Sequence, residues 1–116
     1  MTDVTLFHNP RCSTSRHAYD ELADADVEVV EYLKTPLDRT QLLALIDKLE
    51  DPPADLVRKD AYFKKQGLDT DDYTSPNAVA DLLVEHPRLM ERPVIVRGER
   101  AIIGRPKHRV TEFMSS

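Results

Sequence analysis

Cysteine is almost absent from this sequence of 116 residues, which contains a single one, Cys12. One cysteine cannot form an internal disulfide, and the sequence offers no cysteine and histidine spacing of the kind that binds zinc. No apolar run is long enough to cross a bilayer, and the first residues lack the basic stretch of a signal peptide. These absences predict a soluble cytoplasmic protein that does not interact with a membrane and whose thiol stays reduced.

An excess of positive charge is also missing, since the formal net charge is −5 at pH 7. This balance argues against non-specific binding of nucleic acid. The acidic run of Asp69, Asp71 and Asp72 is interpreted as a solvated loop, because hard cations need roughly six or more arranged oxygen ligands. We therefore expect no metal and no bound cofactor. Ten of the 16 basic residues are arginine, the side chain best suited to bidentate recognition of oxyanions.

Apolar periodicity predicts the order β-α-β, a helical insert, and then β-β-α. The first strand, helix and second strand form a βαβ unit, which implies a parallel pair of strands. Asp38 and Gln41 form a capping box at the start of the main helix of the insert. The prediction is an α/β fold with a mixed sheet and a single domain over residues 1–116. The strands are expected at 4–8, 27–32, 93–96 and 101–103, with the insert at about 36–90.

Cys12 is predicted to lie after the first strand, in the loop that leads into the first helix. Ligands tend to bind at this end of the strands in open α/β sheets. A helix N-terminus carries partial positive charge, and such a position can lower a cysteine pKa from about 8.5 to between about 3.5 and 7.5. His8, Arg11 and Arg16 are candidate contributors, although both arginines could equally face solvent. An inert, buried cysteine is the alternative, because free cysteine often acts as a small apolar residue.

The absence of a second cysteine near Cys12 restricts the chemistry. A thioredoxin-like dithiol site needs the pattern Cys-x-x-Cys, and Ser15 occupies the second position here. An oxidised or covalent form of Cys12 therefore has no internal thiol to resolve it. If Cys12 takes part in a catalytic cycle, the thiol that regenerates it has to come from another molecule.

Three arginines stand next to predicted breaks in secondary structure, namely Arg58, Arg92 and Arg105. Arg92 and Arg105 each precede a proline, which favours extended backbone at the arginine. Both also flank predicted strand ends, where a side chain can be held rigidly at a site. Ordinary exposure on the surface is the alternative for each of them, and periodicity alone does not bring the three to Cys12.

The stretch His8-Asn9-Pro10-x-Cys12-Ser13-Thr14-Ser15-Arg16 resembles the glutaredoxin-dependent arsenate reductases of the ArsC family. Further motifs match the family in order and spacing over nearly the whole chain: Arg58-Lys59, Arg92-Pro93-Val94-Ile95-Val96 and Arg105-Pro106. The resemblance implies a thioredoxin-like sheet with a helical insert between its second and third strands. It also implies a cis-proline at Pro93. Arg11 departs from the pattern, because well-known members carry a small residue there.

The resemblance further implies an activity and site residues. Cys12 would attack arsenate to give a covalent thiol–arsenate adduct, which glutathione and then glutaredoxin would resolve. His8 would help to keep Cys12 ionised, and Ser15 would hydrogen-bond the thiolate. The residues expected to bind the oxyanion are Arg58, Arg92 and Arg105.

Two alternatives from the same structural class remain open. One is a regulator like Spx, which binds RNA polymerase. Many such regulators use Cys-x-x-Cys as a redox switch, which Ser15 excludes here, and the three arginines would then have no evident purpose. The other is a glutathione-dependent thiol enzyme of the same fold with a different substrate.

Overall fold

A four-stranded mixed sheet lies at the centre of residues 3–115, the part of the chain that the computed structural model describes. The strands are β1 (Val4–His8), β2 (Val27–Glu31), β3 (Val94–Arg97) and β4 (Arg100–Ile103). Their order is β2-β1-β3-β4, with β1 parallel to β2 and antiparallel to β3. The predicted α/β class, mixed sheet and element order are confirmed.

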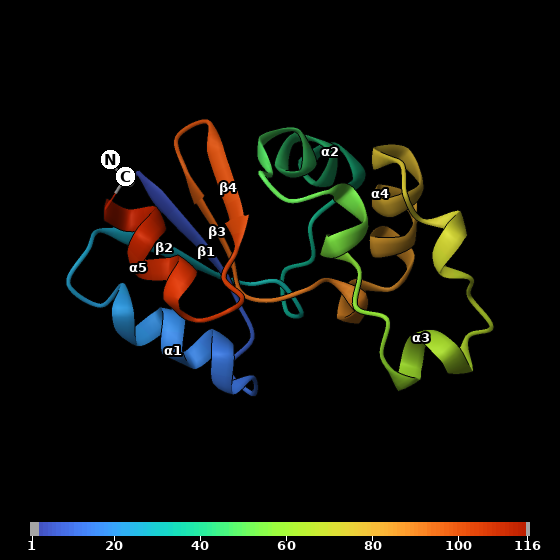
Figure 1. The fold of residues 1–116 in the computed structure, drawn as a ribbon, viewed down its shortest axis with the longest axis horizontal. Coiled ribbons are helices and arrows are strands. Elements are labelled where there is room, and N and C mark those ends of the chain that lie inside the picture. The colour runs from blue at the N-terminus through green and yellow to red at the C-terminus, as the bar shows by residue number, and fades with distance from the viewer. Residues whose placement is uncertain (1–2, 116) are drawn as a thin grey trace.

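Alternate side chains of the strands pack into two separate cores, one on each face of the sheet. Leu6 and Ile95 point to the face covered by α1 (Ser13–Glu21) and α5 (His108–Ser115). Val94 and its neighbours on the opposite face pack against the helical insert. Figure 1 shows α1 and α5 together on one side of the sheet and the insert on the other. The sheet therefore separates the two cores, and its strand ends lie where the two parts of the molecule meet.

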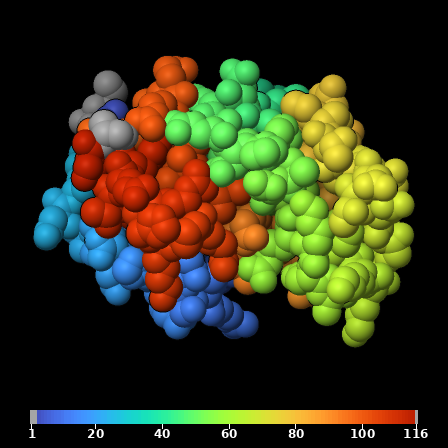
Figure 2. All heavy atoms as spheres, viewed as in Figure 1, coloured from blue at the N-terminus to red at the C-terminus, as the bar shows by residue number. Residues whose placement is uncertain are grey.

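The insert between β2 and β3 consists of short helices. Its elements are α2 (Arg39–Lys48), η1 (Pro53–Leu56), α3 (Ala61–Lys65), η2 (Thr70–Asp72), α4 (Pro76–Glu85) and η3 (Pro87–Leu89). Asp38 closes the predicted capping box with Gln41, and Ser75 caps α4 by accepting from the N–H of Ala78. In Figure 2 the insert, coloured green to yellow, forms one side of the molecule. No helix within residues 3–115 is long and apolar enough to cross a membrane.

The helix α1 begins at Ser13, directly after Cys12, as the sequence predicts. Ser13, Thr14 and Ser15 are all good capping residues, but the N-cap residue is Cys12 in extended conformation. The hydroxyl residues thus occupy the first turn, and the thiol takes the position in which a side chain faces the free N–H groups of the helix.

Candidate active site

Cys12 is held at the junction of β1 and α1 by its own backbone. Its N–H donates to the carbonyl oxygen of Asn9 at 3.0 Å, and its carbonyl accepts from the N–H of Arg16 at 2.9 Å. The first bond closes a turn after β1, and the second begins α1. The thiol is free and partly exposed. It is therefore fixed in position and still accessible to a small molecule.

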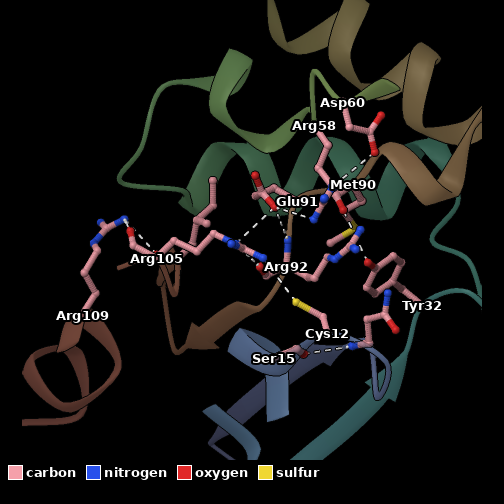
Figure 3. Close-up of polar contacts among 12 residues, drawn as sticks. Cys12, Ser15, Tyr32, Arg58, Asp60, Met90, Glu91, Arg92, Arg105 and Arg109 are labelled. Atoms are coloured by element: carbon pink, nitrogen blue, oxygen red, sulfur yellow. Dashed lines mark hydrogen bonds and ion pairs between the residues drawn. The ribbon is translucent and has the colours of Figure 1, made fainter. Parts of the chain in front are cut away.

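The surroundings of Cys12 favour its ionised form. Burial raises the pKa of the thiol, but the N–H groups of Ser15 and Thr14 oppose this effect. The side chain of Arg92 and the positive charge of Arg105 lower the pKa further, and the resulting pKa lies below its ordinary value. Arg105 Nη2 donates to Cys12 Sγ at 3.2 Å, as Figure 3 shows. The thiolate is thus stabilised by a helix N-terminus and by two guanidinium groups.

The lowered pKa predicts how Cys12 reacts with a neutral alkylating reagent. The rate follows the thiolate fraction, so it should stay high as the pH falls and decline only below the lowered pKa. The midpoint of the rate profile, measured with iodoacetamide, should lie below the ordinary thiol value of about 8.5. Protein unfolded in urea is the control and should titrate at the ordinary value. Identical midpoints for folded and unfolded protein would contradict this prediction.

His8 and Ser15 form a buried contact beside Cys12. The side chain of Ser15 is completely buried, and its Oγ lies 2.7 Å from His8 Nδ1 and accepts from the N–H of Asn9 at 3.0 Å. The ring of His8 stacks on Tyr19. Burial lowers the pKa of His8, with a smaller opposing effect of Glu31 and a further lowering by Arg16. The hydroxyl of Ser15 is thus directed to the strand end, while its N–H lies beside the thiol.

Arg92 and Arg105 reach Cys12 from the open end of the β3–β4 hairpin. Because β1 and β3 are antiparallel, the end of β1 lies next to the start of β3, with Phe7 opposite Val94. The Arg92–Pro93 peptide bond at this point is cis. Arg105 Nε donates to the carbonyl oxygen of Arg92 at 2.7 Å. The sheet topology therefore brings both arginines to the loop that carries the thiol.

Gly104 allows the two arginine segments to approach closely. Its N–H donates to the carbonyl oxygen of Pro93 at 2.8 Å, and a Cβ at this position would lie 2.9 Å from Pro93 Cγ. Real Cβ atoms do not approach a neighbour so closely, so a side chain here would push the two segments apart. Because Gly104 has no side chain, the backbone segment that carries Arg105 can pack closely against the segment that carries Arg92.

A second group of contacts, made by Arg109 and Asp51, also fixes the backbone segment that carries Arg105. Arg109 Nη1 donates to Asp51 Oδ1 at 2.9 Å and to the carbonyl oxygen of Ile103 at 2.8 Å. Asp51 Oδ2 in turn accepts from the N–H of Ile103 at 3.0 Å. These part-buried bonds tie the end of β4 to the segment of the insert between α2 and η1. They fix the backbone from which Arg105 extends.

Arg58 joins the site through a short backbone pairing within the insert. Val57 and Met90 form an isolated antiparallel bridge, flanked by hydrogen bonds from Arg58 N to Leu89 O and from Glu91 N to Leu56 O, both 2.7 Å. This pairing sets Arg58 beside the segment that leads into Arg92. The side chain of Arg58 is 23% exposed and points toward the other two arginines in Figure 3.

Two buried nitrogens of this cluster have no hydrogen-bond acceptor among the described residues, namely Arg58 Nε and Arg92 Nε. Asp60 Oδ2 lies 3.5 Å from Arg58 Nε, which is an ion pair but not a hydrogen bond. Buried guanidinium donors are costly to leave unpaired. The site therefore has donor capacity that suits a small anion with several oxygens.

Sequence reasoning missed Glu91 and Tyr32. Glu91 Oε1 accepts from the N–H of Arg92 at 3.1 Å and contacts two of the arginines. The hydroxyl of Tyr32 is buried and donates to Met90 O at 3.4 Å. Burial raises the pKa of Tyr32, although Arg92 opposes this effect. The position of Glu91 directly before a candidate arginine was the one available signal. Nothing in the sequence pointed to Tyr32, which looks like an ordinary strand residue.

Other candidates from the sequence lie elsewhere. Arg11 and Arg16 are exposed, and Arg16 donates to the carbonyl oxygen of Pro10 instead of approaching Cys12. Within residues 3–115, no three histidine, cysteine or carboxylate side chains are grouped closely enough to hold a metal ion. The site that the structure assembles is thus a partly exposed thiolate facing three arginines. Such an arrangement can bind an oxyanion and attack its central atom.

Comparison with known proteins agrees with this geometry. The family model of the ArsC family matches residues 7–113. An arsenate reductase of Neisseria meningitidis serogroup B is 38% identical over 110 residues, covering 91% of this chain and 93% of the relative. The Escherichia coli protein YfgD is 40% identical and covers 96% of each chain. The structure of an arsenate reductase from Vibrio cholerae superposes with a TM-score of 0.82 at 32% identity, covering 94% of this chain and 95% of that one. The fold of this chain is thus shared with a known arsenate reductase, and the chain belongs to the ArsC family.

Proposed function

We propose that this protein is an arsenate reductase that uses Cys12 as its nucleophile. The observation that carries the proposal is the contact between Arg105 Nη2 and Cys12 Sγ at 3.2 Å, beside guanidinium donors that have no acceptor among the described residues. This contact supports a site in which Cys12 attacks an oxyanion that the guanidinium groups bind. The names of the relatives supply the identity of the oxyanion.

The first proposed step is substitution at arsenic. The sulfur of Cys12 forms a bond to arsenic(V), and one arsenate oxygen takes up protons and leaves as water. Arg58, Arg92 and Arg105 hold the remaining oxygens and stabilise their charge. His8 and Ser15 position the loop of Cys12 through their buried contact, and Pro93 fixes the segment that carries Arg92.

The second proposed step is reduction by external thiols. Arsenic(V) gains two electrons to become arsenic(III), and these electrons come from the Cys12 sulfur and from glutathione. The two sulfurs end as a mixed disulfide, and arsenite leaves. A glutaredoxin thiol then exchanges with this disulfide and regenerates Cys12. A second thiol near Cys12 is lacking because residue 15 is serine, which supports an external donor. This dependence on reduced thiols supports a cytoplasmic location.

A coupled assay tests the proposal on the wild-type protein. Arsenate, glutathione, glutaredoxin, glutathione reductase and NADPH are combined, and NADPH oxidation is followed. We expect oxidation that requires both arsenate and this protein, and that stops when glutathione is omitted. Phosphate in place of arsenate is the control and should give no turnover, because phosphorus(V) is not reduced by thiols. Absence of arsenate-dependent oxidation at every protein concentration would contradict the proposed function.

A further inference from the structure

The arginine cluster of the site already contains a carboxylate. Glu91 Oε1 lies 3.4 Å from Arg58 Nη1 and 3.3 Å from Arg105 Nε, and it also accepts from the N–H of Arg92. Its side chain is only 22% exposed. Figure 3 shows Glu91 between Arg58 and Arg105, on the side of the cluster opposite the helix that carries Cys12. The cluster is therefore three guanidinium groups, one thiol and one carboxylate.

The contacts of Glu91 with the guanidinium groups are long. Charge-assisted N–H···O⁻ bonds are typically about 2.7–2.9 Å, so the hydrogen bond of 3.4 Å from Arg58 Nη1 to Glu91 Oε1 is weak. Arg105 Nε lies 3.3 Å from Glu91 Oε1 and donates instead to the carbonyl oxygen of Arg92. Arg58 Nε has no hydrogen-bond acceptor among residues 3–115. A tetrahedral oxyanion could approach Arg58 more closely than the carboxylate does, but it would do so against the negative charge of Glu91.

The position of Glu91 also gives its side chain room to move. Glu91 and Arg105 line one side of an open hollow of about 340 Å³ on the surface of the molecule. Lys59 and Arg109 line the same hollow, together with the carboxylates of Asp51 and Asp55. A carboxylate that turns away from the arginines would thus lie among charged groups of both signs. Its withdrawal does not require it to enter an apolar environment.

We propose that the carboxylate of Glu91 competes with the bound oxyanion for Arg58 and Arg105. It weakens the binding of every oxyanion, and so keeps the site from being held by abundant anions such as phosphate. This inference rests on the proposed function for the identity of the substrate, but not for the competition itself.

The variant Glu91→Gln removes the charge and keeps the shape. Its amide oxygen can still accept from the N–H of Arg92, so the backbone contact is retained. The probe is inorganic phosphate, and the readout is the phosphate concentration that halves the rate of Cys12 alkylation. We expect this concentration to fall about tenfold in the variant, as removal of one negative charge a few ångströms from the bound anion would cause.

Steady-state kinetics with arsenate give a second readout. Tighter anion binding should lower the KM of Glu91→Gln about as much as the half-protecting phosphate concentration, whereas kcat should stay constant because the bound substrate and the transition state are stabilised alike. The exposed hairpin residue Glu99 provides the matched control, and Glu99→Gln should match wild type in every readout. Glu91→Ala should shift phosphate protection in the same direction if Glu91→Gln is poorly folded.

The outcomes separate this inference from the proposed function. If wild type reduces no arsenate but phosphate protects Cys12 more strongly in Glu91→Gln, the substrate is wrong and the role of Glu91 stands. If arsenate is reduced but phosphate protection is unchanged or weaker in the variant, Glu91 is a structural support for the arginines and the inference is overturned. Lack of any phosphate protection in both proteins also overturns it.

Discussion

Replacing Cys12 by serine should reduce arsenate-dependent turnover to the background of the coupled assay, a loss of about 10⁴-fold or more. A serine hydroxyl does not ionise near neutral pH, even beside the N–H groups and guanidinium charges that lower the pKa of Cys12. It also cannot form the disulfide in which the two electrons leave the site. Turnover by Cys12→Ser above that background would rule out the thiol as the nucleophile.

The variant needs two controls for this result to be informative. Ser13→Ala alters the next residue along the same loop, whose side chain is exposed, and should have wild-type activity. Thermal unfolding of Cys12→Ser should show a Tm close to that of wild type, since the thiol is only partly buried and forms no disulfide. Together these results would assign the loss to chemistry and not to folding.

Replacing Arg92 or Arg105 by alanine should lower kcat/KM about 10²–10³-fold each, which is typical for removal of one donor from a site that stabilises developing negative charge. Arg105→Ala removes the donor that lies 3.2 Å from Cys12 Sγ. Arg92→Ala removes a side chain whose Nε has no acceptor within residues 3–115. Both changes should also raise the midpoint of Cys12 alkylation, because each arginine lowers the thiol pKa.

A conservative substitution and a distant arginine define the controls. Arg105→Lys keeps the positive charge but loses the planar guanidinium group that can donate two parallel hydrogen bonds. Its activity should therefore lie between that of Arg105→Ala and that of wild type. Arg39 forms an exposed ion pair with Asp81 on the insert, and Arg39→Ala should change kcat/KM by no more than about twofold. Wild-type kinetics for Arg92→Ala and Arg105→Ala would show that they are ordinary surface residues.

Local signals in the sequence predicted most of the elements of this fold. Asp38 with Gln41 marks a helix start that the structure contains, because caps satisfy N–H groups within a few residues. Strand bounds were less accurate. The last strand begins at Arg100, since the hairpin turn is tighter than the apolar pattern suggests, with Gly98 at a positive φ.

The assembly of the site could not be predicted from periodicity. Arg92 and Arg105 meet Cys12 because β3 lies antiparallel to β1, and Arg58 joins them through one isolated bridge. Neither pairing leaves a trace in the spacing of apolar residues. Only the resemblance to a family brought the arginines together in advance. Glu91 was missed because its position before Arg92 is a weak signal, and its contacts depend on distances in the folded chain.

The short pairing of residues 56–58 with residues 89–91 means that a bound substrate would also stabilise the folded chain. An anion bound by Cys12, Arg58 and Arg105 would cross-link the first loop of the chain, the helical insert and the end of the last strand. Since an unfolded chain cannot present these groups together, the ligand would bind the folded form alone. At a concentration about a hundred times its Kd, such a ligand adds about 2.7 kcal/mol to the free energy of unfolding. The protein would therefore be most resistant to heat and proteolysis when its toxic substrate is abundant.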